Sequence, residues 1–259
     1  MCMVGTVVIK WGGGLITHKD KLCTANQDVI DSLAKICSNT SKNLVIIHGA
    51  GSFGHMKAKK HRLAEGRIEG LDQDSAVREV RGDMLKLNQI VVSALRAHGL
   101  DVRSFPPHEW AKGTGPQFAG NLPLHNGVTV VYGDVVDDDY KEFGILSGDD
   151  IMLRYSTEIS NVERAIFAVG GVDGILRVPP NKAKPEDLID VWHPGLEFEG
   201  EHASEIDVTG GIGLKASRGA MIAEQGIDVL LVNGEKYERI LAAIEGESVI
   251  GTRIIVGNC

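Results

Sequence analysis

Three glycine-rich turns, each with a lysine or histidine beside it, carry the chemistry that this sequence could perform. They occupy residues 10–14 (Lys-Trp-Gly-Gly-Gly), residues 49–55 (Gly-Ala-Gly-Ser-Phe-Gly-His) and residues 207–215, which end in Gly-Gly-Ile-Gly-Leu-Lys. Consecutive glycines let a backbone bend sharply and approach a ligand, and their N–H groups can face one anion together. A cationic side chain beside them adds charge. The spacing predicts phosphate-binding turns, and plain tight turns are the alternative for the first and the third.

The second turn also matches the G-x-G-x-x-G pattern of dinucleotide-binding folds. That pattern requires a helix packed on the sheet directly after its third glycine, Gly54. Residues 55–62 offer no apolar face for such packing, and the turn does not follow the first strand of the chain. The sequence therefore favours a phosphate nest with His55 as an additional donor.

The third turn is not a Walker A loop, because Ala216 follows Lys215 where that loop requires serine or threonine. Backbone N–H groups at the start of a helix, with a lysine nearby, still suit a polyphosphate. Acidic residues also follow glycines at residues 148–150 and 170–174. These carboxylates could orient lysines or hold Mg²⁺ through water, and helix caps or turn formers are the alternative.

The composition limits the possible partners. The chain has 259 residues, 43% of them hydrophobic, and a formal net charge of -8. This charge argues against general affinity for nucleic acid or an anionic membrane. The four cysteines form no C-x-x-C pair, which fits a reduced cytoplasm. The first residues lack the charged and apolar regions of a leader, and no apolar run reaches roughly 18 residues, so we expect neither a leader nor a membrane span. We expect a cytoplasmic protein that binds a small anion through a local group of cations.

Short apolar runs that alternate with helical patterns predict an α/β fold with a mainly parallel sheet covered on both faces. No linker divides the chain, so we expect one domain over residues 1–259. Residues 56–71 are basic and irregular, which indicates a mobile cover, and the four prolines within residues 177–206 indicate an excursion from the sheet. The predicted strands are residues 6–9, 44–47, 128–131, 165–169, 229–232 and 254–256, and the predicted helices are residues 28–36, 75–97 and 215–224.

Taken together, these segments resemble the amino acid kinase superfamily and, within it, the isopentenyl phosphate kinase branch. The resemblance covers essentially the whole chain. Lys10 with its glycines and Thr209-Gly210-Gly211 with Lys215 are typical of the superfamily. His55, at the end of Gly-Ser-Phe-Gly-His, is typical of the branch whose acceptor is a phosphate or phosphonate, which includes fosfomycin kinases. The resemblance implies a three-layer αβα sandwich, with an acceptor-binding lobe at about residues 1–150 and a nucleotide-binding lobe at about residues 151–259.

The resemblance also implies a role for each matching residue. Lys10 and Lys215 would neutralise the transferring and leaving phosphates, Lys19 would stabilise the transition state, and Asp149 would orient the lysines. His55 would hold the phosphate that the acceptor already carries. The implied ATP-binding residues are Lys10, Gly12, Gly13, Gly51, Asp173, Gly211 and Lys215, and the implied acceptor-binding residues are Ala50, His55 and Gly148. No residue is assigned to a metal, and Mg²⁺ is expected to accompany ATP. Gly14 departs from the family pattern, which has serine there.

The expected reaction is the ATP-dependent phosphorylation of isopentenyl phosphate to isopentenyl diphosphate by a cytoplasmic homodimer. The apolar stripe of residues 75–97 could wall the pocket for the acceptor's tail. We expect Met84 to line that pocket, because a thioether adapts to a ligand, and Val77, Val80 and Leu87 to belong to the core. A kinase for another phosphate or phosphonate and a non-catalytic nucleotide-binding protein are the alternatives.

Overall fold

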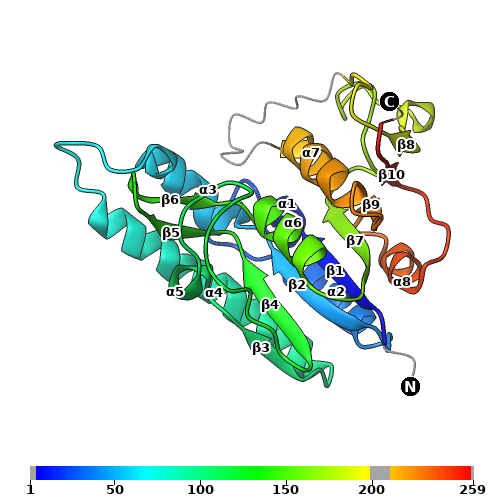
Figure 1. The fold of residues 1–259 in the computed structure, drawn as a ribbon, viewed down its shortest axis with the longest axis horizontal. Helices are drawn as coiled ribbons and strands as arrows, with labels where there is room; N and C mark the ends of the chain where they lie inside the picture. The colour runs from blue at the N-terminus through cyan, green and yellow to red at the C-terminus, as the bar shows by residue number, and fades with distance from the viewer. Residues whose placement is uncertain (1–3, 199–210, 258–259) are drawn as a thin grey trace.

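An eight-stranded sheet forms the centre of the molecule in a computed structural model that describes residues 4–198 and 211–257 (Figure 1). Neighbouring strands are parallel except for the β9–β10 pair. In sheet order the strands are β3 (Val102–Ser104), β4 (Val128–Tyr132), β2 (Asn43–His48), β1 (Thr6–Trp11), β7 (Val162–Val169), β9 (Asp228–Asn233), β10 (Thr252–Ile254) and β8 (Val191–Trp192).

The central strands are buried on both faces, which explains why they are continuous apolar runs rather than alternating patterns. Every residue of β1 and of β4 is buried, and so is every residue of β2 except Asn43. The prediction of a mainly parallel sheet is confirmed, as are the first five predicted strands. The last one is misplaced, because β10 ends at Ile254 and the next two residues are partly exposed.

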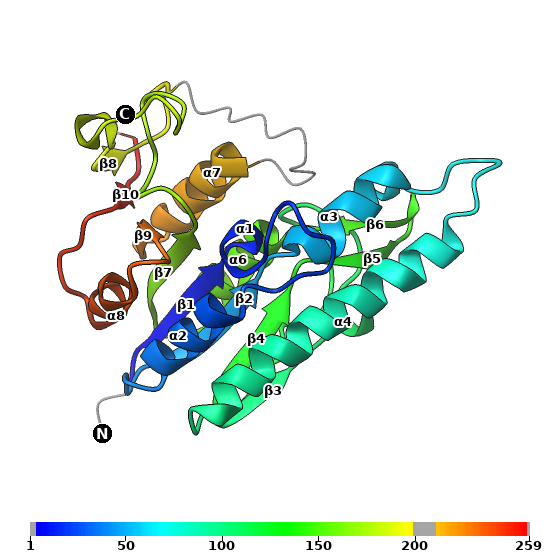
Figure 2. The same cartoon turned by 180° about the vertical axis from the view of Figure 1, so that it is seen from behind.

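Helices cover both faces of the sheet and give the three layers that the sequence predicts. Figure 2 shows α2 (Gln27–Cys37) and α4 (Asp74–Ala97) on one face, where α8 (Tyr237–Glu245) shares their apolar cluster. On the other face, α6 (Gly148–Glu158) and α7 (Gly211–Ala223) pack in a second cluster. The three predicted helices are confirmed as α2, α4 and α7. None of the described helices is both long and apolar enough to span a bilayer.

The prediction that residues 56–71 form an irregular cover is wrong for much of this segment. Helix α3 (Gly51–Lys60) begins inside the second glycine turn and continues into this segment, which then forms the 3₁₀ turn η1 (Leu63–Glu65). Phe53 and Ala58 of α3 are buried against the core, so tertiary packing stabilises a helix whose apolar stripe is too weak to predict.

Several elements were not predicted from the sequence. Among those already described these are α6, α8, β3 and β8. The others are α1 (Gly13–Ile16), α5 (Pro107–Trp110) and the hairpin formed by β5 (Asp134–Asp138) and β6 (Glu142–Leu146). In the proline-rich excursion, η2 (Pro185–Asp187) precedes β8, which joins the sheet edge beside β10. Residues 199–206 of the predicted excursion lie outside the described residues.

Candidate active site

Two of the three glycine-rich turns meet at the carboxyl ends of β1 and β2, the edge of an open parallel sheet where ligands bind. A Cβ atom added to Gly13 would lie 2.3 Å from the backbone nitrogen of Gly51, and one added to Gly49 would lie 2.5 Å from the nitrogen of Gly13. Gly51 also has a positive φ of 48°. Only glycine therefore permits the two backbones to approach so closely, and the approach brings their N–H groups together.

Two lysines share one buried carboxylate beside these turns. Lys10, at the end of β1, pairs with Asp149 on the first turn of α6, and both side chains are almost fully buried. Lys215 Nζ, on α7, lies 3.6 Å from the other Asp149 oxygen and donates a hydrogen bond to Gly211 O at 3.1 Å. Ser147 caps α6 by accepting a 3.1 Å hydrogen bond from the Asp149 N–H. The group keeps a net positive charge, so it suits phosphate better than a metal ion.

A second ion pair joins α6 to α7 next to this group. Arg218 Nε donates to Asp150 Oδ1 at 2.6 Å, and both side chains are largely buried. Burial raises the pKa of Asp150, and the Arg218 guanidinium partly offsets that rise. Asp150 directly follows Asp149 on α6, and Arg218 lies one turn after Lys215 on α7. The Arg218–Asp150 pair therefore holds together the two helices that carry Asp149 and Lys215.

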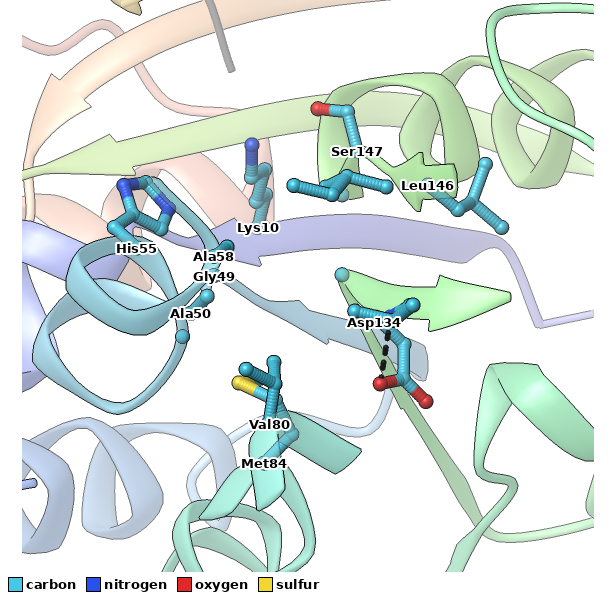
Figure 3. A pocket seen from close by; sticks show the side chains of 15 residues that line it. Lys10, Gly49, Ala50, His55, Ala58, Val80, Met84, Asp134, Leu146 and Ser147 are labelled. Atoms are coloured by element: carbon cyan, nitrogen blue, oxygen red, sulfur yellow. Dashed lines mark hydrogen bonds between the residues drawn. The ribbon is translucent and has the colours of Figure 1, made fainter. Parts of the chain in front are cut away.

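A mainly apolar cavity of about 40 Å³ lies between α3, α4 and the β5–β6 hairpin (Figure 3). A water-sized group needs about 10–15 Å³, so the cavity has room for a short chain of three or four such groups. Met84 lines it, and so does Val80, which also belongs to the buried core as the sequence analysis expected. Val77 and Leu87 are core residues, as expected. The other apolar lining residues include Ala58, Val135, Ile145 and Leu146.

The polar end of this cavity holds the residues expected to bind an acceptor phosphate. Lys10, Ala50, His55 and Gly148 all line the cavity. Figure 3 shows the Lys10 ammonium and the His55 ring on the same side, away from Met84. One end of the cavity is therefore cationic, and the rest is mainly apolar apart from Asp134, whose carboxylate pairs with His108. This arrangement matches a small molecule with an anionic head and a hydrocarbon tail.

A larger cleft of about 290 Å³ opens on the other side of Lys10 and His55. Its walls include Gly12, Gly13, Gly51, Gly211 and Lys215, five of the residues assigned to ATP. Lys19 also lines the cleft and lies over Gly14, because a Cβ atom added to Gly14 would be 2.7 Å from Lys19 Cε. A side chain at residue 14, such as the serine of the family pattern, would have to displace this lysine.

Asp173 is placed differently from the other ATP-binding candidates. It is absent from the walls of the cleft, and its Oδ1 accepts hydrogen bonds from Asn233 Nδ2 at 3.0 Å and from Arg239 at 2.8 Å. The first part of the third glycine turn, residues 207–210 with Thr209 and Gly210, lies outside the described residues. Two site candidates from the rest of this turn, Gly211 and Lys215, line the cleft.

Apart from Asp149, the sequence analysis gave no role to the residues that position the site. The start of α6 was detectable, because Ser147 followed three residues later by Asp150 has the spacing of a helix-capping box. Thr17 accepts a 3.0 Å hydrogen bond from the Ser52 N–H and donates to Gly13 O at 2.7 Å, so it joins the first two turns. No sequence signal pairs Arg218 with Asp150, because 68 residues separate them.

The fold and the site together define a class of phosphotransferase, and comparison with known proteins agrees. The profile of the amino acid kinase family matches residues 5–233, so the chain belongs to this family. Within the family, its relatives include the isopentenyl phosphate kinases of Methanothermobacter thermautotrophicus, with 33% identity over 96% of this chain and 98% of the relative, and Thermoplasma acidophilum, with 32% identity over 96% and 99%. A solved isopentenyl phosphate kinase structure superposes with a TM-score of 0.82 and 31% identity, over 96% of this chain and 99% of its own.

Proposed function

We propose that this protein transfers the terminal phosphoryl group of ATP to isopentenyl phosphate and so forms isopentenyl diphosphate. The observation that carries the proposal is the cavity with Lys10 and His55 at one end and Met84 and Val80 at the other. Full-length similarity to isopentenyl phosphate kinases supports the choice of acceptor.

The proposed chemistry needs charge neutralisation more than it needs a base. A phosphate monoester is already anionic near neutral pH, so its oxygen can attack without losing a proton. Two unit charges about 4 Å apart repel by roughly 4 kcal/mol at an effective dielectric of 20. Two lysines that share one carboxylate, with His55 and the N–H groups of two turns nearby, offset that repulsion and align the reactants for a loose transition state.

The side chains divide this work by position. Lys10 lines both the cavity and the cleft, so it is the candidate for the phosphoryl group in transfer. Lys19 and Lys215 line the cleft alone and are assigned to the nucleotide phosphates. His55 is assigned to the phosphate of the acceptor, and Asp149 holds two of the lysines in place.

The residues of the cleft fit nucleotide phosphates, because its donors are ammonium and N–H groups. Among the described residues, no three side chains of the metal-binding types lie together. Asp149 is engaged by two lysines. We therefore assign Mg²⁺ to the phosphates of ATP and not to a set of protein ligands. On those phosphates it would add positive charge to the leaving group. We also propose that residues 1–150 bind the acceptor and that residues 151–259 bind the nucleotide together with the first two glycine turns, which line the same cleft. We propose a cytoplasmic homodimer as well, and size-exclusion chromatography with light scattering would test the dimer.

Steady-state kinetics with ATP and four acceptors tests the function. The acceptors are isopentenyl phosphate, methyl phosphate, isopentenol and the phosphonate fosfomycin. We expect kcat/KM to be highest for isopentenyl phosphate, because burial of each further methylene contributes about 0.8 kcal/mol, and the alcohol to be nearly inert. Equal rates for the alcohol and its phosphate would exclude a phosphate acceptor. A higher kcat/KM for fosfomycin would identify a phosphonate kinase.

A further inference from the structure

A buried histidine that the proposed chemistry does not use lies directly beneath the second glycine turn. His48 is the last residue of β2, has no exposed surface and stacks on Tyr132 with ring centroids 4.9 Å apart and an interplanar angle of 20°. Its Nδ1 lies 3.2 Å from the carbonyl oxygen of Gly49, and its Nε2 lies 3.4 Å from Asn88 Oδ1. Both contacts link the ring to acceptor oxygens, although a neutral imidazole has one proton to donate.

The surrounding groups decide which ring nitrogen carries that proton. The carbonyl oxygen of Gly49 can only accept, whereas the Asn88 amide can turn so that its NH₂ group replaces its oxygen. After this exchange the two N–H groups of Asn88 would serve His48 Nε2 and Ser104 Oγ, which lies 3.0 Å from the same amide atom. Both ring nitrogens of His48 then have a partner if the proton is on Nδ1, because Nδ1 donates to the Gly49 oxygen and Nε2 accepts from Asn88. The other tautomer would place two lone pairs, on Nδ1 and on the Gly49 oxygen, against each other.

The Gly49 carbonyl matters because it fixes the direction of an N–H group in the site. The peptide between Gly49 and Ala50 is trans, so the Gly49 C=O and the Ala50 N–H point in opposite directions. On its other side, Gly49 is anchored by its own N–H, which donates to Trp11 O at 2.9 Å. Since Gly49 has no Cβ to restrict the rotation of the next peptide, the contact with His48 supplies that restriction.

We propose that His48 is a positioning residue: as a neutral imidazole that donates from Nδ1 to the Gly49 carbonyl, it turns the Ala50 N–H toward the phosphate of the acceptor. This inference rests on the proposed function, which places that phosphate between Ala50 and His55 at the polar end of the cavity. His48 acts on the acceptor through the Gly49 carbonyl and does not touch it.

The environment of His48 keeps the ring neutral. Complete burial lowers its pKa to about 4, and the contacts with Gly49 and Asn88 only partly oppose that shift. A neutral ring is required because an imidazolium beneath the turn would be a buried charge without a carboxylate partner. The stacked Tyr132 ring limits rotation of the imidazole and so preserves its direction.

Two variants with a side-chain amide test the contributions of the two ring nitrogens separately. The side-chain amide of His48→Asn reaches the position of Nδ1 and keeps the donor to Gly49, whereas that of His48→Gln reaches the position of Nε2 and loses it. We expect the KM for isopentenyl phosphate to stay within about threefold in His48→Asn and to rise about tenfold in His48→Gln, the value of one neutral hydrogen bond. The KM for ATP should be unchanged in both, and equal melting temperatures would separate this effect from lost stability.

An acceptor KM in His48→Gln that equals or is lower than that in His48→Asn would overturn the inference. If neither variant folds, ¹⁵N spectra of the histidines in the unaltered enzyme decide the question, because they distinguish a protonated Nδ1 from a protonated Nε2. A proton on Nε2 of His48 would overturn the inference without any mutation. This readout needs no turnover, so failure of the inference is distinguishable from failure of the proposed acceptor.

Discussion

The acceptor cavity and the nucleotide cleft are built from different parts of the chain. Side chains on two helices and a hairpin enclose the cavity, and most of them are apolar. The cleft is larger, and backbone atoms of glycine turns form much of its wall. Lys10 and His55 belong to both regions. We therefore expect single side-chain substitutions to change the preferred ligand of the cavity, whereas the phosphate binding that we propose for the cleft depends on a backbone that substitutions alter less easily.

The largest effect should follow removal of the lysine that both regions share. We expect Lys10→Ala to lower kcat by about 100- to 1,000-fold, because the charge that it neutralises moves during transfer. The KM for ATP should change little. Lys112→Ala is the matched control, because Lys112 forms an exposed ion pair with Asp139 away from the site and should keep parental activity. A near-parental kcat with only a raised ATP KM in Lys10→Ala would contradict the assignment.

The contact between the two glycine turns should be nearly as sensitive. In Gly13→Ala the new Cβ would lie 2.3 Å from the nitrogen of Gly51, so the turns must separate. We expect kcat/KM to fall about 100-fold for both substrates, since small displacements of reacting groups have effects of this size. Gly82→Ala on α4 is the control, because nothing lies within 4 Å of its new Cβ. Parental kinetics for Gly13→Ala would show that the close approach is unimportant.

Substitution of His55 tests whether acceptor binding in the cavity can be changed without changing ATP binding in the cleft. We expect His55→Ala to raise the KM for isopentenyl phosphate by about 10- to 100-fold, because one charge-assisted hydrogen bond to the acceptor is lost, while the KM for ATP changes little. His55→Gln should retain more activity, since it can still donate one hydrogen bond. Because His55 also lines the cleft, an equal rise in both KM values would place it on the nucleotide instead.

The pair between α6 and α7 should affect the nucleotide side alone. We expect Arg218→Gln to raise the KM for ATP or lower kcat by about tenfold and to lower the melting temperature, because Asp150 loses its buried partner. Arg218→Lys, which keeps the charge, should recover part of both. An acceptor KM that rises in parallel would mean that the two regions are coupled through these helices.

The smallest effect concerns the choice of tail. We expect Met84→Ala to shift kcat/KM severalfold toward longer prenyl phosphates, since it enlarges the apolar end of the cavity. Leu87→Ala is a matched control on the same helix, because Leu87 is fully buried in the core. Both variants should lose about 2–5 kcal/mol of stability. An equal change of preference in both would attribute the shift to loosened packing rather than to the cavity wall.

The sequence by itself determined the fold class and the two ends of the acceptor cavity. Short apolar runs predicted the parallel strands, because a strand buried on both faces must be apolar throughout. The glycine turns after β1 and β2 were visible because glycine is required where backbones approach closely, as Gly13 and Gly51 do. His55 and Met84 were recognisable because each follows directly from a local pattern, and both line the cavity.

The tertiary structure decided which distant residues meet. Helix α3 forms because the core buries Phe53 and Ala58, although its own sequence has little helical periodicity. Val80 lines the cavity and Arg218 reaches Asp150 because helix packing sets those contacts, and Asp173 bonds to Asn233 and Arg239 outside the walls of the cleft. Which nitrogen of the His48 ring carries the proton depends on Gly49, Asn88 and Tyr132, and only the folded chain brings these residues around the ring. Local pattern identifies groups that can bind phosphate, and packing determines their distances and directions.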